Sequence, residues 1–170
     1  MKTLEQFKVF QASPEAVFNC LDDLGVTGMH MTESSMPMMG GKMDLQFLTS
    51  HKTGLATKYR WTGKVMWWPL DFTVEVIKWI GGKEKIWKTT GPVKLIIYSW
   101  FQMNLKVWGD KEDSVARLSI SYEKPNGLFN QFLCFLAGDW YCKWCLNNML
   151  DDTERKLKNS SSSFEMLFKS

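Results

Sequence analysis

The sequence predicts a single α+β domain, in which a curved antiparallel sheet of about seven strands wraps around one long C-terminal helix. Two features of the chain lead to this fold class. Between residues 43 and 123, apolar and polar side chains alternate with a period of two, and turn-forming residues interrupt the alternation. Residues 128–158 contain no proline and many good helix formers. Each strand therefore offers one apolar face, and the helix is the element available to cover it.

The chain begins with the pattern of a strand over residues 4–10, followed by a short helix. Residues 13–15, Ser-Pro-Glu, combine an N-cap, a proline at the first helical position and an acidic residue in the first turn. Apolar residues recur at helical spacing over residues 17–24. Glycines at 25 and 28 predict the end of this helix or a break in it.

Four turn signals divide the alternating region into the strands of an antiparallel meander, at residues 51–54, 81–82, 90–92 and 109–110. Residues 101–107 illustrate the strands between them, since Phe, Met, Leu and Val occupy the odd positions and Gln, Asn and Lys the even ones. One face of each strand is thus suited to water, and the other has to be buried.

The long helix carries apolar residues on two faces. One face runs from Phe129 to Trp144, and the other, rotated by about a third of a turn, runs from Cys142 to Leu157. Gly138 lies near the change of face, where a glycine costs about 1 kcal/mol relative to alanine. It indicates a kink or a close contact, or it packs against a bulky tryptophan.

The domain is predicted to span residues 1–158, followed by a Ser-rich flexible tail over residues 159–170. The run 159–163 contains only Asn and Ser, which is typical of a polar linker, and the short segment after it is expected to fray.

Composition narrows the class of function. The chain has 170 residues, enough for one core, and its nine Trp, eleven Phe and eleven Met form a bulky, soft apolar set that suits the lining of a cavity. The net charge is +3 and the basic residues are scattered, which disfavours nucleic acid as a partner. No apolar run approaches the roughly 20 residues of a membrane span, so we expect a cytoplasmic protein without an integral membrane segment. The sequence does not indicate an oligomeric state.

Neither a metal site nor a cofactor is predicted. Cys142 and Cys145 match C-x-x-C, but they have no second pair or nearby histidine and lie within a helical pattern, which favours structural packing over metal or redox chemistry. His30 and His51 lie in different segments and lack a carboxylate at metal-ligand spacing. No catalytic residue is predicted either.

Residues 28–43 contain six methionines and one histidine, which makes them the most distinctive stretch of the chain. Flexible thioethers are suited to an adaptable lid over an apolar tunnel, and glycines 28, 40 and 41 would supply the hinge. A Cu(I) site of thioether and imidazole ligands is the alternative. The predicted gate residues are Met29, Met31, Met36, Met38 and Met39.

The apolar positions of strands and helix that must face each other predict the lining of a ligand cavity. Two tyrosines in this set can each donate a hydrogen bond, which suits orienting a carbonyl or hydroxyl group. The predicted ligand-binding residues are Tyr59, Trp61, Phe72, Val74, Leu105, Leu118, Ile120, Tyr122, Phe132, Leu136 and Trp140.

The order of these elements resembles the SRPBCC superfamily, which includes the START lipid-transfer, Bet v 1-like and polyketide cyclase/dehydrase proteins. Residues 12–18 look like the entry to that family's first helix, residues 59–63 like a central strand, and residues 141–150 like its final helix. The resemblance covers about residues 1–158 and implies a helix-grip fold, with a hydrophobic tunnel used for lipids, sterols, polyketides, quinones or plant hormones.

Three functions are compatible with this resemblance. The leading hypothesis is a binding or carrier protein for a small hydrophobic ligand, because the inward positions are nearly all apolar. A cyclase or dehydratase acting on an aromatic, polyketide-like substrate is the second, and a carboxylate or histidine in the tunnel would support it. An interaction module of the chaperone-activator type is the third, and it predicts a collapsed tunnel and an exposed apolar patch.

Overall fold

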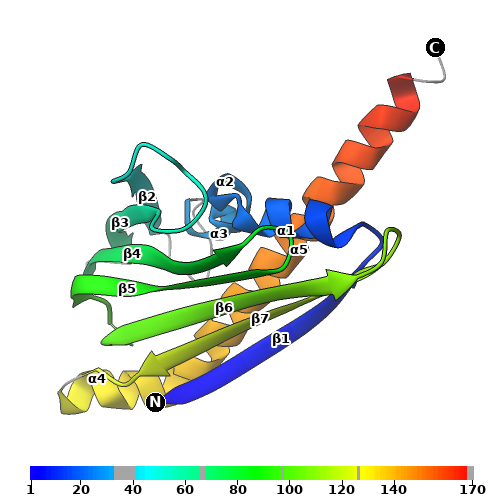
Figure 1. Ribbon diagram of the computed structural model, residues 1–170. Coiled ribbons are helices and arrows are strands. Elements are labelled where there is room, and N and C mark those ends of the chain that lie inside the picture. Colours follow the sequence, from blue (N-terminus) through cyan, green and yellow to red (C-terminus); the bar gives the residue numbers. More distant parts are fainter. Residues whose placement is uncertain (33–40, 66–67, 97, 126, 168–170) are drawn as a thin grey trace.

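The computed structural model describes residues 1–32, 41–65, 68–96, 98–125 and 127–167. In these residues, seven strands form one antiparallel sheet in the order β1-β7-β6-β5-β4-β3-β2, which confirms the predicted fold class (Figure 1). The strands are β1 Lys2–Phe10, β2 Lys42–Phe47, β3 Lys58–Val65, β4 Trp68–Ile80, β5 Glu84–Lys94, β6 Trp100–Gly109 and β7 Ser114–Glu123. The helices are α1 Pro14–Asp22, α2 Leu24–Thr27, α3 Met29–Thr32, α4 Leu128–Leu133, a π-helical turn η1 Cys134–Gly138 and α5 Asp139–Leu167.

The first helix begins with the N-cap and the proline that the sequence predicts. The hydroxyl of Ser13 accepts a hydrogen bond from the backbone N–H of Ala16 at 3.3 Å, and Pro14 occupies the first helical position. The helix ends at Asp22, before the first of the two glycines, because Asp23 adopts an extended backbone and caps the short helix α2. The carboxylate of Asp23 accepts a hydrogen bond from the N–H of Gly25 at 2.8 Å.

The strands bury alternate residues, so the sheet has one apolar, concave face. In β6, Phe101, Met103, Leu105 and Val107 are buried and the residues between them are at least partly exposed. The pairing of β4 with β5 contains two register shifts, one between Asp71 and Thr73 and one between Val76 and Lys78, which indicate β-bulges. The sheet curls around α5, which lies against its concave face, while α1, α2 and α3 lie near its upper end (Figure 1).

The C-terminal helix is interrupted where the sequence changes face. The π-helical turn η1 ends at Gly138, and a Cβ atom at this glycine would lie 3.2 Å from the Cys134 sulfur and 3.8 Å from the Tyr122 hydroxyl oxygen. The close-contact interpretation of Gly138 therefore holds, with tyrosine and cysteine neighbours in place of tryptophan.

Helix α5 continues to Leu167 and includes residues 159–163, which the sequence predicts to be a linker. Neither Gly nor Pro interrupts residues 139–167. The hydroxyl of Ser160 donates to the carbonyl of Lys156 at 2.9 Å, so this serine bonds back onto the helix that it extends. The last turns project beyond the sheet (Figure 1). That residues 159–170 form a separate, flexible tail stays a prediction.

Candidate ligand cavity

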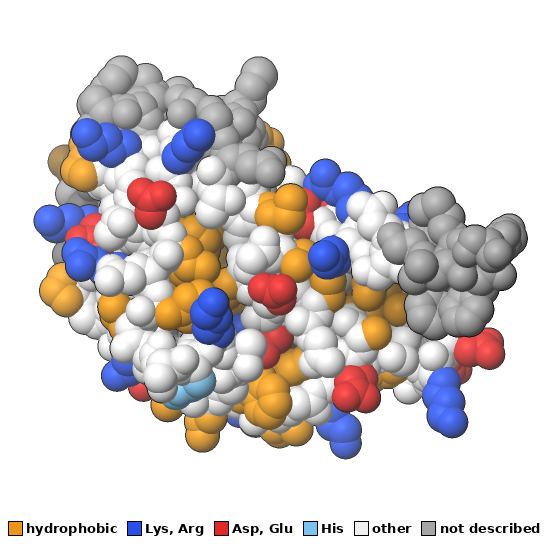
Figure 2. Space-filling view, turned by 90° about the horizontal axis from the view of Figure 1, so that it is seen from above, with side chains coloured by type: hydrophobic (Ala, Val, Ile, Leu, Met, Phe, Trp, Pro, Cys, Tyr) orange, Lys and Arg blue, Asp and Glu red, His pale blue; other side chains and the backbone are white. Residues whose placement is uncertain are grey.

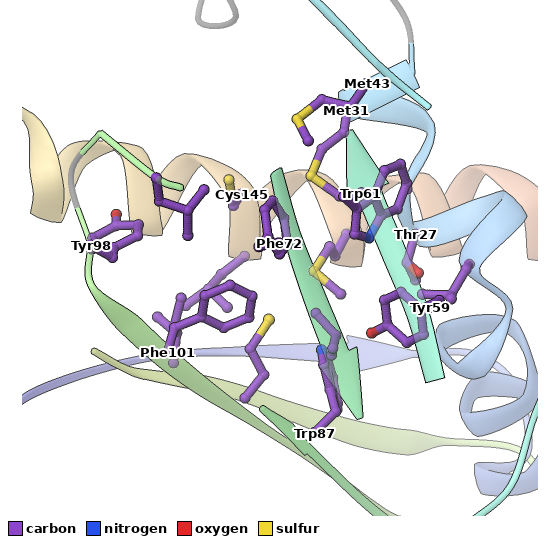
Figure 3. Close-up of a pocket in the computed structure, with 18 of the residues that line it drawn as sticks. Thr27, Met31, Met43, Tyr59, Trp61, Phe72, Trp87, Tyr98, Phe101 and Cys145 are labelled. Atoms are coloured by element: carbon purple, nitrogen blue, oxygen red, sulfur yellow. The ribbon is translucent and has the colours of Figure 1, made fainter. Parts of the chain in front are cut away.

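A cavity of about 110 Å³ lies between the concave face of the sheet and helix α5. Figure 3 shows it extending from Tyr98 and Cys145 at one end to Thr27 and Tyr59 at the other. Its wall is almost entirely apolar. The lining residues are Leu21, Leu24, Thr27, Gly28, Met31, Met43, Tyr59, Trp61, Leu70, Phe72, Val74, Lys85, Trp87, Leu95, Tyr98, Phe101, Met103, Ile120, Tyr141, Cys145, Leu146 and Met149.

The structure places five of the predicted ligand-binding residues at the cavity wall, namely Tyr59, Trp61, Phe72, Val74 and Ile120. All five side chains are at most 7% exposed. The phase predicted for these strands is therefore correct, because a shift of one residue would have turned every one of them to the outer face.

Three further predicted strand residues are buried but do not line the cavity. Leu105 and Leu118 are 0% exposed and face each other across β6 and β7. Tyr122 is 2% exposed, and its hydroxyl donates to the carboxylate of Asp139 at 2.6 Å. These side chains belong to the packed core and do not contact the cavity.

The structure does not place the three predicted helix residues at the cavity. Phe132, Leu136 and Trp140 are 57%, 61% and 57% exposed, so they do not line the cavity. They lie in α4, in η1 and at the start of α5, where the π turn breaks the 3.6-residue period that the prediction assumed. The helix instead turns its second apolar face to the cavity, with Tyr141, Cys145, Leu146 and Met149.

Part of the predicted gate can be located. Met31 lines the cavity, whereas Met29 is 40% exposed and is not part of its wall. Met36, Met38 and Met39 lie outside the described residues. Met43, which was not predicted, is buried and lines the cavity in β2.

Gly28 contributes to the cavity through its lack of a side chain. A Cβ atom at this position would lie 2.8 Å from the Trp61 ring, closer than real Cβ contacts allow. The backbone conformation is that of an ordinary right-handed helix residue. The glycine therefore permits close packing on Trp61, and its predicted role as a hinge stays a prediction.

Lys85 is the one charged side chain among the described residues that line the cavity, and it is not among the residues predicted from the sequence. The residue is 3% exposed, and in β5 it shares the inward phase with Trp87 and Thr89. This phase was visible in the sequence, because residues 85, 87 and 89 alternate with Glu84, Ile86 and Lys88. The lysine was missed because an inward position was assumed to be apolar.

A buried carboxylate partners this lysine. The Nζ atom of Lys85 lies 2.5 Å from Oδ1 of Asp22 and also donates to the Asp22 backbone carbonyl at 3.4 Å. The indole N–H of Trp79 donates to the other carboxylate oxygen, Oδ2, at 3.0 Å. Burial lowers the pKa of Lys85, and the charge of Asp22 opposes this shift.

Tyr59 lies at the same end of the cavity. Burial, together with the negative charge of Asp22, raises the pKa of its hydroxyl far above the ordinary value. The hydroxyl therefore stays protonated, and Figure 3 shows that it points into the cavity. Lys85 and Tyr59 are hydrogen-bond donors in an otherwise apolar wall.

The C-x-x-C pair lies at the opposite end, near Tyr98. The Tyr98 hydroxyl donates to the carbonyl of Gly138 at 2.9 Å and also lies 2.9 Å from the Cys142 sulfur. Burial raises the pKa of the Cys142 thiol to about 11, with the Tyr98 hydrogen bond acting against it. This environment is unlike that of a reactive thiol. No group of three or more His, Cys, Asp or Glu residues in the described ranges could hold a metal ion. That the thiols stay reduced and free of zinc remains a prediction.

Solved structures share this architecture along nearly the whole chain. TTHA0849 from Thermus thermophilus superposes with a TM-score of 0.70 at 16% identity, over 94% of this chain and 99% of that one. Norcoclaurine synthase from Thalictrum flavum, in complex with dopamine and hydroxybenzaldehyde, has a TM-score of 0.65 at 12% identity, with coverage of 93% and 87%. The Zhui aromatase/cyclase of a Streptomyces species has a TM-score of 0.64 at 12% identity, with coverage of 92% and 92%.

The chain has the helix-grip fold that these solved structures share, an antiparallel sheet curled around a long C-terminal helix. At these identities the likeness establishes the fold and leaves the activity open. A scan against protein-family models and a search of curated proteins both found no match. No helix in the described part of this helix-grip chain is long and apolar enough to cross a membrane.

Proposed function

We propose that this helix-grip protein binds a small hydrophobic ligand, about the size of one aromatic ring, in the cavity between sheet and helix. The observation that carries this proposal is an apolar space of about 110 Å³ inside an otherwise packed core. Protein interiors are close-packed, and an empty cavity costs stability in proportion to its volume. An apolar cavity of about 150 Å³ is enough to bind benzene, so this space suits a ligand of similar size.

The ligands of one structural neighbour support the size of this ligand. Norcoclaurine synthase was solved with dopamine and hydroxybenzaldehyde, and each of these compounds has one aromatic ring. Larger ligands such as lipids or polyketides would need side chains to move, and Met31 and Met43 are flexible residues at the wall that suit this. A gate formed by Met29, Met31, Met36, Met38 and Met39 is part of the proposal.

Nucleic acid is not part of the proposal. On the face shown in Figure 2, basic and acidic side chains are interspersed, and hydrophobic side chains gather between them. Several surface lysines and arginines are also paired with carboxylates, as Arg60 is with Asp71 at 2.6 Å. Such a surface lacks the continuous basic stripe that tracks a phosphate backbone.

We propose that the protein acts in the cytoplasm.

Each alternative function has one supporting observation. The Lys85–Asp22 pair places a titratable group at the cavity, as a cyclase or dehydratase would need. The exposed apolar residues of α4 and η1 match one expectation for an interaction module. That hypothesis also predicts a collapsed tunnel, whereas the structure has a cavity of about 110 Å³. Binding of a small ligand therefore accounts for more of the structure than either alternative.

Calorimetric titration with α-methylstyrene, a flat apolar molecule with one ring, tests the proposal. We expect saturable binding with one site per chain. Ile120→Trp should abolish it because the indole fills the cavity, whereas Leu136→Trp, which adds the same ring to a residue that is 61% exposed, should bind the probe as the wild type does. The proposal fails if the wild type shows no saturable binding, or if Ile120→Trp, folded, binds as well as Leu136→Trp.

A further inference from the structure

The ammonium of Lys85 has more donors than its protein partner uses. A lysine ammonium carries three N–H groups. In the described structure, Asp22 provides one ion-pair contact at 2.5 Å and one carbonyl acceptor at 3.4 Å. The Nζ atom also lies 5.0 Å from the centre of the Trp87 ring, and Trp87 is itself part of the cavity wall. The geometry leaves a donor for a molecule in the cavity.

Stability alone gives a weak reason for a lysine at this position. Removing two charges from water costs several kcal/mol per ion, and their mutual attraction often does no more than balance that cost. Apolar residues of similar volume in a buried site are frequently as stable or more stable. A charged pair at the wall of an apolar cavity is therefore better explained by what it offers to a ligand.

The charge of the site selects the kind of acceptor. Because Asp22 neutralises Lys85, the pair adds no net positive charge that would favour a carboxylate or a phosphate. A neutral oxygen with exposed lone pairs can accept a hydrogen bond here without bringing a second charge out of water. The Tyr59 hydroxyl points into the cavity (Figure 3) and lies close enough to Asp22, the partner of Lys85, for the carboxylate charge to act on it, so it offers a second donor to such an oxygen.

We propose that Lys85 donates a hydrogen bond to the carbonyl oxygen of the ligand, so that the preferred ligands are small aromatic ketones or aldehydes. The ring would occupy the apolar part of the cavity, beside the Phe72 and Phe101 rings, which pack edge-to-face on each other with centroids 5.7 Å apart, and the carbonyl would point to Lys85 and Tyr59. This inference rests on the proposed function and makes it more specific, because it assigns a polar group and its position to an otherwise apolar ligand.

The test compares two probes of nearly the same shape. Acetophenone and α-methylstyrene differ in having C=O or C=CH₂ at the same position, so their hydration differs but their size does not. Comparing each probe between wild type and variant cancels the difference in hydration. Lys85→Met keeps the length of the side chain and removes the donor, and Asp22→Asn combined with Lys85→Met also removes the carboxylate that would be left unpaired.

We expect both variants to bind acetophenone at least about tenfold more weakly than the wild type, because a hydrogen bond from a charged donor is lost. Their affinity for α-methylstyrene should change less than about threefold. Lys78→Met, in which the lysine that pairs with Glu84 on the outer surface is replaced, is the control and should leave both affinities unchanged.

The inference is wrong if the folded double variant binds acetophenone within threefold of the wild type while α-methylstyrene binding is normal. It is also wrong if both probes weaken equally, because Lys85 would then act only on the shape of the cavity. Absence of binding of either probe to the wild type would instead overturn the proposed function, and the carbonyl preference with it.

Discussion

At the scale of single residues, burial decides the chemistry of the cysteines. Cys142 is 1% exposed, and its pKa of about 11 means that only about 0.1% of the thiol is ionised at pH 8 in the folded protein. A neutral, buried thiol is a poor nucleophile and a poor metal ligand. Cys142 therefore packs in α5 as a buried thiol against the Tyr98 hydroxyl.

The raised pKa of Cys142 predicts a dependence of stability on pH. The ordinary pKa of a cysteine thiol is 9.0, so above pH 9 the unfolded chain releases this proton. The folded chain retains the proton up to about pH 11. The contribution of this thiol is thus fully present below pH 9 and is lost as the pH rises towards 11, by at most about 1.4 kcal/mol per pH unit.

Urea unfolding of wild type and Cys142→Ser between pH 8 and pH 10.5 measures this difference. We expect the free energy of unfolding of the wild type to fall more steeply over this range than that of the variant. Parallel curves for the two proteins would show that the thiol titrates as it does in the unfolded chain, and that the burial described here is wrong.

At the scale of elements, the two apolar faces of the C-terminal helical segment differ in burial. Leu146 is 0% exposed and lines the cavity, whereas Leu136, in the π-helical turn, is 61% exposed. We expect Leu146→Ala to lower the free energy of unfolding by about 2–5 kcal/mol and Leu136→Ala to change it by less than about 0.5 kcal/mol. Chemical denaturation of the two variants measures both values, and a larger loss for Leu136→Ala would restore the helix face predicted from the sequence.

The same helix shows what could be predicted from the sequence and what could not. The strands were predicted well, because a period of two fixes the face of every residue once one face is apolar, and Tyr59, Trp61 and Phe72 lie as expected. The helix carries apolar residues all along two faces, and periodicity does not decide which face points inward. The π turn at Cys134–Gly138 separates the two faces, and its only signal in the sequence was Gly138.

Lys85 was missed for a different physical reason. Its phase in β5 was visible, but a lysine on an apolar face is normally a solvated side chain on the other side of the strand. It becomes possible here through Asp22 at the end of α1, a residue 63 positions away in the sequence. The alternation of a single strand contains no information about such a partner.

At the scale of the whole molecule, the cavity follows from how the sheet and the helix are covered. The curved sheet alone would leave its concave face open, and α5 covers it with Tyr141, Leu146 and Met149. Helices α2 and α3 close one end with Thr27 and Met31. The result is an apolar space between one layer of sheet and one layer of helix. Lys85, paired with Asp22, is the charged side chain at its wall among the described residues.

The most direct test of this account is a crystal structure of the protein pressurised with xenon, which enters apolar cavities and is visible by its anomalous scattering. We predict a xenon atom in contact with Trp61, Phe72 and Phe101, between the sheet and α5. A fully packed interior without xenon at that place, or xenon bound only at the surface, would contradict the central claim that the fold encloses a ligand cavity.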